Sequence, residues 1–259
     1  MNLIDDCKAK YIYCIGENPG NWPSEVMGVE GSLVYHVVYR DIAAVVHDCA
    51  EQPYNSDDNN KVIDWVLGHQ LVVDKACSCY SSVLPFTFNS IVKGKEDLSS
   101  HEILVNWLED NYDNFKLKLG KIKGKKEYSV QLFLDKQVSL SLLQSESDIL
   151  ELQVELLGSA KGKAYFVQEK INKKIGELMA NRADSYCRQF YHEISSVVSE
   201  CKLCKLKQAG RNEIMIINLV CLAGDNEVEV LGDVLEKIKS NDIAIKIKFS
   251  GPWPAYSFV

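Results

Sequence analysis

The N-terminal part of the chain combines β-rich segments with a helix that has one apolar face. Residues 11–15 and 33–39 are rich in β-branched and aromatic side chains, and Asp41 begins a turn into a third expected strand, residues 42–46. From Val62 onward, apolar residues recur every three or four positions, which predicts a helix packed on these strands. The positions expected to face the core are Val62, Trp65, Val66, Val72, Val73, Ala76 and Tyr80.

A second helix and a further strand follow. Residues 101–119 have inward-facing apolar positions at helical spacing, and Gly120 and Gly124 then end the helix. Residues 128–134 have the composition of a strand. The order strand, strand, helix, strand, helix, strand resembles a ferredoxin-like unit with an additional strand near its start. We therefore expect a first domain to span residues 1–136.

The second half contains the clearest helical pattern. Residues 163–201 keep one apolar stripe for many turns. A strand at 213–222, a helix at 226–239 and a strand at 243–249 follow. The stripe consists of Ile171, Ile175, Leu178, Met179, Ala183, Tyr186, Cys187, Phe190, Ile194, Val197 and Val198. These elements predict a second domain built around one long helix.

The expected fold class is α+β, with two ferredoxin-like domains that each consist of an antiparallel sheet with helices packed on one face. Residues 1–136 form the first domain, and residues 137–162, where leucines stand among polar residues, form a bridging helical segment. The C-terminal domain spans residues 163–250. Residues 251–259 form a tail rich in proline and aromatic residues, which fits neither a helix nor a central strand.

Composition and charge narrow the class of protein. A net charge of −7 and a pI near 5.3 argue against nucleic acid as a partner, because phosphate binding requires clustered basic residues. The one basic run, residues 116–126, is typical of a solvated helix end. No stretch has the length of a membrane span, and residues 1–11 hold charges instead of an export signal. We expect a cytoplasmic protein whose nine cysteines are reduced.

Two cysteine motifs are the only candidates for a metal site. Cys77 and Cys79 form a CxC and Cys201 and Cys204 a CxxC, which together could supply four thiolates to zinc. Cys77 and Cys201, however, fall on apolar helical stripes, where cysteine commonly acts as a small buried apolar residue. We therefore expect no metal.

No catalytic or cofactor site is expected either. The five histidines are scattered without a chelating pair, and His69 shares a helical face with apolar residues, as a packed histidine does. The glycine- and lysine-containing segment 158–163 lacks the spacing of a phosphate-binding loop. No nucleophile elbow or HExxH motif is present.

The tail is the most unusual segment of the chain. It reads GPWPAYSFV, and Trp253, Tyr256 and Phe258 offer large apolar areas on a backbone that two prolines stiffen. Such a segment can pack against the protein's own domains or dock on a partner. We expect the three aromatic residues to fold back and help to hold the two domains together.

The tail also carries a resemblance to a known family. The gas vesicle protein F/L family typically ends in a segment of this kind after its last strand. Four further segments match the family in order and spacing: 11–16, 41–46, 69–73 and 83–86. The chain departs from the family at residues 87–89, where members often have a glycine after the aromatic residue, and in the cysteines of the first helix.

The resemblance implies a minor, non-enzymatic component of gas vesicles that is needed for their formation. Its implied partners are the small hydrophobic shell protein, gas vesicle protein A, and other accessory proteins of the vesicle. Its implied location is the gas vesicle within the cytoplasm. An enzyme on ferredoxin-like domains and a metal- or thiol-binding module remain as alternatives.

Overall fold

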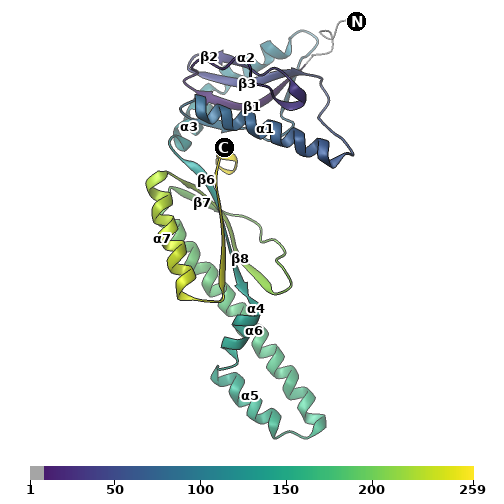
Figure 1. The fold of residues 1–259 in the computed structure, drawn as a ribbon, viewed down its shortest axis with the longest axis vertical. Helices are drawn as coiled ribbons and strands as arrows, with labels where there is room; N and C mark the ends of the chain where they lie inside the picture. The colour runs from purple at the N-terminus through teal and green to yellow at the C-terminus, as the bar shows by residue number, and fades with distance from the viewer. Residues whose placement is uncertain (1–8) are drawn as a thin grey trace. The chain divides into compact units, whose positions relative to one another are not determined.

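The computed structural model describes residues 9–259, which form two compact units (Figure 1). Unit 1 contains the chain up to residue 127 together with residues 252–259, and unit 2 contains residues 128–251. The chain therefore passes from one unit to the other twice. Within the described residues, no helix has the length and apolar character required to cross a bilayer.

Unit 1 is built around a five-stranded antiparallel sheet. Its strands are β1 (Ala9–Glu17), β2 (Tyr35–Tyr39), β3 (Ile42–Cys49), β4 (Val83–Pro85) and β5 (Ile91–Lys93). The strand order is β2-β3-β1-β4, and β5 also pairs with β1. β1 is thus the central strand of the sheet.

Helices cover both faces of this sheet. They are α1 (Asn59–Cys79), α2 (Ser100–Asp110) and α3 (Tyr112–Ile122), and all nine residues of β1 are buried. The core beneath α1 contains Tyr11 and Tyr13 but neither Ile12 nor Ile15, which are buried on the opposite face. Since α2 and α3 also lie against β1, they cover that second face. The expectation of helices on one face is therefore wrong for unit 1.

Unit 2 contains a four-stranded sheet. Its strands are β6 (Lys126–Asp135), β7 (Glu200–Leu203), β8 (Glu213–Ala223) and β9 (Ile245–Trp253), in the order β7-β8-β6-β9. β7 and β8 are antiparallel. β7 and β9 form the two edges, and the more buried strands β8 and β6 lie between them.

Four helices belong to unit 2: α4 (Lys136–Leu143), α5 (Ser147–Leu157), α6 (Lys161–Ser195) and α7 (Asp225–Asn241). The C-terminal half of α6 and one face of α7 share a core with the sheet, while the N-terminal part of α6 pairs with α5. The α+β class predicted from the sequence, with antiparallel sheets and helices packed on them, is confirmed.

The expected domain limits differ from this division. The segment 128–134, which we expected to close the first domain at residue 136, is β6, and it pairs with β8 and β9 in unit 2. The tail, expected to be a separate segment, returns to unit 1. A strand's own composition does not specify which other strands it pairs with, so the sequence pattern could not reveal this assignment.

Two further local predictions are corrected. The long helix ends at Ser195 and not at Cys201, because residues 200–203 are recruited as edge strand β7 by pairing with β8. Val66, expected to face the core of unit 1, exposes 44% of its surface. The other six expected core positions of α1 are buried or partly buried.

Candidate functional site

The C-terminal segment completes the packing of unit 1. Residues Tyr256–Phe258 form a short 3-10 turn (η2), in which Phe258 is 3% exposed and Tyr256 packs against the core beneath α1. The Tyr256 hydroxyl donates a hydrogen bond to Gln70 Oε1 of α1 at 3.1 Å. Trp253 exposes 49% of its surface. All three candidate aromatic residues therefore belong to unit 1, where Tyr256 and Phe258 are packed and Trp253 is half exposed.

A buried carboxylate fixes the turn at the chain end. The backbone N–H of Ser257 donates to Glu127 Oε2 at 2.7 Å, and its hydroxyl donates to Glu127 Oε1 at 2.8 Å. Glu127 is 8% exposed, so both of its oxygens are satisfied inside the protein. Gly251, where the tail begins, has φ of 133°, a conformation that strains any residue with a Cβ. The hydrogen bonds to Glu127 and the backbone conformation of Gly251 therefore fix the course of the tail backbone.

A network of tyrosines and histidines lies beneath α1. The Tyr11 hydroxyl is 2.8 Å from His69 Nδ1, and the Tyr13 hydroxyl is 2.8 Å from His47 Nδ1. His69 Nε2 donates to the carbonyl of Phe86 at 3.0 Å, so His69 Nδ1 accepts from Tyr11. His47 Nε2 lies 2.9 Å from the hydroxyl of Tyr54.

Burial determines the protonation of this network. It lowers the pKa of His47 to about 4 and lowers the pKa of His69, while it raises the pKa values of the two core tyrosines, Tyr11 and Tyr13. Both histidines are therefore neutral near pH 7, and their ring nitrogens all have partners. The network therefore satisfies the buried polar atoms of Tyr11, Tyr13, His47 and His69 and joins β1, β3 and α1 within the core of unit 1.

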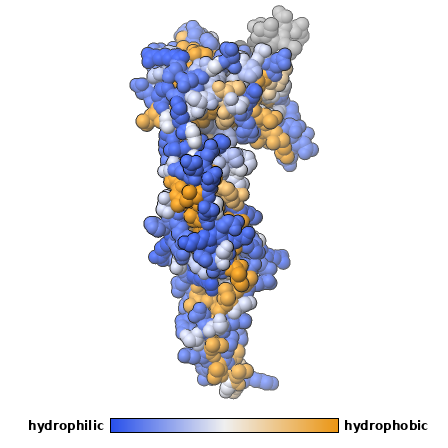
Figure 2. All heavy atoms as spheres, turned by 60° about the vertical axis from the view of Figure 1, so that its left-hand side comes forward, coloured by the Kyte–Doolittle hydropathy of each residue, from blue (hydrophilic) through white to orange (hydrophobic). Residues whose placement is uncertain are grey.

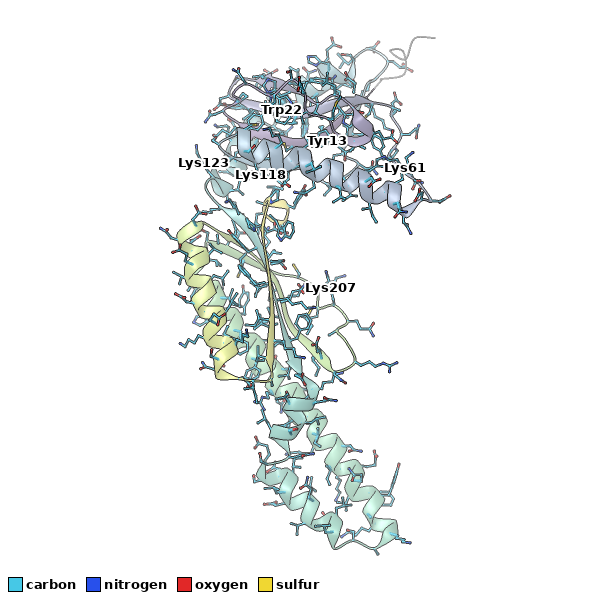
Figure 3. The ribbon with its side chains drawn as sticks, in the orientation of Figure 1. Tyr13, Trp22, Lys61, Lys118, Lys123 and Lys207 are labelled. Carbon is cyan, nitrogen blue, oxygen red and sulfur yellow. The ribbon has the colours of Figure 1, made fainter. Side chains whose placement is uncertain are left out.

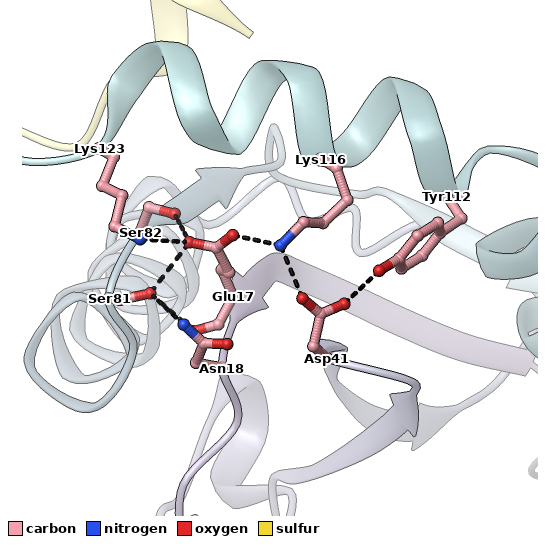
Figure 4. A network of polar contacts seen from close by, with 8 residues as sticks. All are labelled: Glu17, Asn18, Asp41, Ser81, Ser82, Tyr112, Lys116 and Lys123. Atoms are coloured by element: carbon pink, nitrogen blue, oxygen red, sulfur yellow. Dashed lines mark hydrogen bonds and ion pairs between the residues drawn. The ribbon is translucent and has the colours of Figure 1, made fainter.

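A second polar network anchors α3 to the sheet (Figure 4). Lys116 Nζ lies between Glu17 at the end of β1 and Asp41 in the β2–β3 turn, 2.7 Å from Asp41 Oδ2. Lys123 reaches Glu17 Oε2 at 3.1 Å, and the hydroxyls of Ser81 and Ser82 donate to the same oxygen. The hydrogen bond from Lys116 is the main cause that lowers the pKa of Glu17. Two lysines of the basic run thus act in folding.

The two cysteine motifs belong to different units. The CxC lies at the end of α1, where Cys77 is exposed, so its expected place on the buried face is wrong. Cys201 is partly buried against the core of unit 2, and Cys204 is exposed. Within residues 9–259, no group of three or more metal-binding side chains is present.

A second apolar stripe lies on α1, opposite its core face. It consists of Ile63, Val66, Leu67 and Leu71, which expose 54%, 44%, 56% and 68% of their surfaces. We call these four residues the α1 stripe. The loop 27–33 runs beside α1, where Gly68 approaches the backbone of Gly28, and adds two exposed apolar side chains, Met27 and Leu33.

The surface around the α1 stripe is shown in Figures 2 and 3. Apolar side chains gather on the part of unit 1 formed by α1 (Figure 2). Lys61 marks the first turn of α1 (Figure 3), where its ammonium lies 4.8 Å from the ring centre of Trp65 and 3.3 Å from Glu30 Oε1. Ile63, Leu67 and Leu71 are spaced four residues apart in the sequence. The same helix also has a second set of apolar residues at helical spacing, so the pattern did not indicate which set would be exposed.

Comparison with known proteins places the chain in a family. The profile of the family described as Gas vesicle synthesis protein GvpL/GvpF matches residues 9–259. Gas vesicle protein L of Haloferax mediterranei is 31% identical over 242 residues, which cover 89% of this chain and 72% of that protein. Gas vesicle protein L1 of Halobacterium salinarum is 28% identical, with 96% of this chain and 89% of that protein covered.

Solved structures show the same fold. The crystal structure of GvpF from Anabaena matches with a TM-score of 0.74 at 20% identity, covering 97% of this chain and 98% of that chain. GvpF from Microcystis aeruginosa matches with a TM-score of 0.64 at 15% identity over the same shares of both chains. Since the family profile extends over all of the described residues, the chain is a gas vesicle protein that belongs to the GvpL/GvpF family.

Proposed function

We propose that the protein takes part in gas vesicle formation as a non-enzymatic accessory protein and binds the small hydrophobic shell protein through the α1 stripe. Membership of the GvpL/GvpF family supports the role in the vesicle. The α1 stripe supports the contact, because four large apolar side chains in a row on a well-packed helix are exposed without a role in the fold. The protein then acts at the gas vesicle.

The physical case for this surface rests on its rigidity and its chemistry. α1 is anchored by a buried face that includes Trp65, Val72, Val73 and Ala76, so the α1 stripe is held in place before a partner arrives. Contiguous apolar surface on a folded unit is typical of protein-binding sites. Residues at i, i+4 and i+8 match the way in which an apolar helix of a partner packs along another helix. A hydrophobic shell subunit offers that chemistry.

The tail contributes a second element to this proposal. Trp253 is half exposed, whereas Tyr256 and Phe258 are occupied within unit 1. We therefore assign the direct contact with a partner to Trp253 and the α1 stripe, and the support of the tail to Tyr256 and Phe258.

The test uses charge at the α1 stripe. The double variant Leu67→Glu, Leu71→Glu places two carboxylates in the contact and should abolish capture of the shell protein from a vesicle-forming cell that lacks the native copy. Vesicle formation should fail in the same cells. Leu117→Glu on α3 is the matched control, because Leu117 is 75% exposed and lies outside the stripe. Unchanged capture by a folded double variant would refute the assignment of the surface.

A further inference from the structure

The pairing of β7 with β8 gives the CxxC motif an unexpected neighbour. Cys201 lies directly opposite Cys221 in the antiparallel ladder. Successive residues of a strand point to opposite faces, so Cys201 and Cys204, three positions apart, point away from each other. The burial agrees, because Cys201 packs against the core of unit 2 and Cys204 is exposed. The cysteine that faces Cys201 is therefore Cys221.

The hydrogen bonds of the ladder define the geometry of this pair. The N–H of Cys204 donates to the carbonyl of Asn218 at 2.7 Å, which makes residues 204 and 218 a hydrogen-bonded pair. Hydrogen-bonded and non-hydrogen-bonded pairs alternate along an antiparallel ladder. Cys201 and Cys221, three steps away, are thus a non-hydrogen-bonded pair, the class in which Cα atoms are about 4.5 Å apart and side chains come closest.

That separation is compatible with a covalent bond. Disulfides join residues whose Cα atoms are roughly 4.4 to 6.8 Å apart, and side chains of a cross-strand pair lie on the same face of the sheet. Both cysteines are thiols in the structure. Cys221 is completely buried in the core of unit 2, whereas Cys201, at the edge strand, is partly exposed and hydrogen-bonded by Tyr191 of α6. An oxidant can therefore reach the pair only from the side of Cys201.

We infer that Cys201 and Cys221 form a redox site, in which a low-molecular-weight disulfide oxidises the two thiols to a cross-strand disulfide. The thiolate of Cys201 attacks the small disulfide, releases one small thiolate and forms a mixed disulfide. The thiolate of Cys221 then attacks Cys201 Sγ and releases the second small thiolate. Two protein thiols are oxidised, one small disulfide is reduced, and the two protons end on the released thiols.

The bond has a defined consequence for unit 2. β7 is an edge strand of four residues, and the chain beyond Cys204, residues 205–212, forms a loop before it returns as β8. A disulfide between Cys201 and Cys221 closes this loop and fastens the edge strand to the sheet. Oxidised protein should therefore resist unfolding of unit 2 better than reduced protein does.

The experiment uses the full chain, purified with reductant and then freed of it. Burial raises the pKa of Cys201 and raises that of Cys221 to about 12, so only a small fraction of each thiol is thiolate near neutral pH. Incubation with oxidised glutathione is therefore carried out at about pH 8.5, where this fraction is larger. Mass spectrometry of the digested protein should identify one cross-linked peptide pair that contains Cys201 and Cys221. The urea midpoint followed by far-ultraviolet ellipticity should rise, and reductant should reverse both changes.

Variants make the result specific. Cys201→Ser should lose the cross-link, and Cys204→Ser, the matched control at an exposed neighbouring cysteine, should keep it. The cross-link is identified by mass spectrometry in the chain without substitutions, so the result does not depend on whether a variant folds. Glutathione that remains on Cys201 without transfer to Cys221, or a bond from Cys201 to Cys187 or Cys204, would overturn the inference.

Discussion

Phe258→Ala tests whether the last residues of the chain are part of the core of unit 1. Phe258 is 3% exposed and lies one residue beyond Ser257, whose backbone and hydroxyl both bind Glu127. Removing a buried phenyl ring loses its transfer free energy and leaves a cavity, which together cost about 3 to 5 kcal/mol. The substitution should therefore lower the free energy of unfolding of unit 1 by that amount.

The distribution of tryptophan provides a selective assay. All four tryptophans, Trp22, Trp65, Trp107 and Trp253, lie in unit 1, so their fluorescence follows the unfolding of that unit. With a urea m-value of about 2 kcal/mol/M, the loss should move the fluorescence midpoint down by about 1.5 to 2.5 M. Far-ultraviolet ellipticity is weighted toward unit 2, which contains the 35-residue helix α6, and should show a smaller shift.

The control is a substitution at an exposed aromatic residue of the same tail. Trp253→Ala, at a residue that is half exposed, should shift the midpoint much less, with ellipticity as its readout because the substitution also removes a fluorophore. If Phe258→Ala left the fluorescence midpoint unchanged, the tail would not contribute to the core of unit 1. Its aromatic residues would then be available for a partner, as the sequence also allowed.

Three more predictions follow from the structure. Phe190→Ala should destabilise unit 2 by about 3 to 5 kcal/mol in urea unfolding followed by ellipticity, since Phe190 is 5% exposed. Lys173→Ala, at a side chain that is 80% exposed, should have little effect. An unchanged unfolding midpoint of Phe190→Ala would make the apolar stripe of α6 a partner-binding face. The pKa of His47 is about 4 in the folded protein and 6.5 in the unfolded chain, so its contribution to the free energy of unfolding is complete above pH 6.5 and is lost as the pH falls toward 4. This contribution amounts to roughly 3 kcal/mol at most. His47→Gln should flatten the pH dependence of the stability measured by fluorescence between pH 6.5 and 4, and an equally steep curve would contradict the assignment. Deletion of residues 251–259 should lower the unfolding temperature, speed hydrogen exchange within unit 1 and impair vesicle formation. Lost shell-protein binding with unchanged stability and exchange would instead make the tail a recognition segment alone, without a role in the packing of unit 1.

The sequence alone determined the local elements, because helix and strand periodicities are properties of short segments. The stripe that contains Met179, Phe190 and Ile194 identified α6, and the composition of residues 128–134 identified β6. The motif of the tail and the four matching segments pointed to the family, which the profile match then showed. Trp253, Tyr256 and Phe258 were recognised as unusual from their types and spacing.

Only the tertiary structure decided which distant segments meet. Strand pairing placed β6 in unit 2, because backbone hydrogen bonds join any two strands of suitable register and leave little trace in composition. The same ladder brought Cys201 opposite Cys221, a neighbour that the CxxC spacing could not indicate. The two apolar faces of α1 were distinguished only when the sheet covered one of them and left Ile63, Leu67 and Leu71 in solvent. A periodic pattern gives the faces of a helix, but long-range packing decides which face is buried.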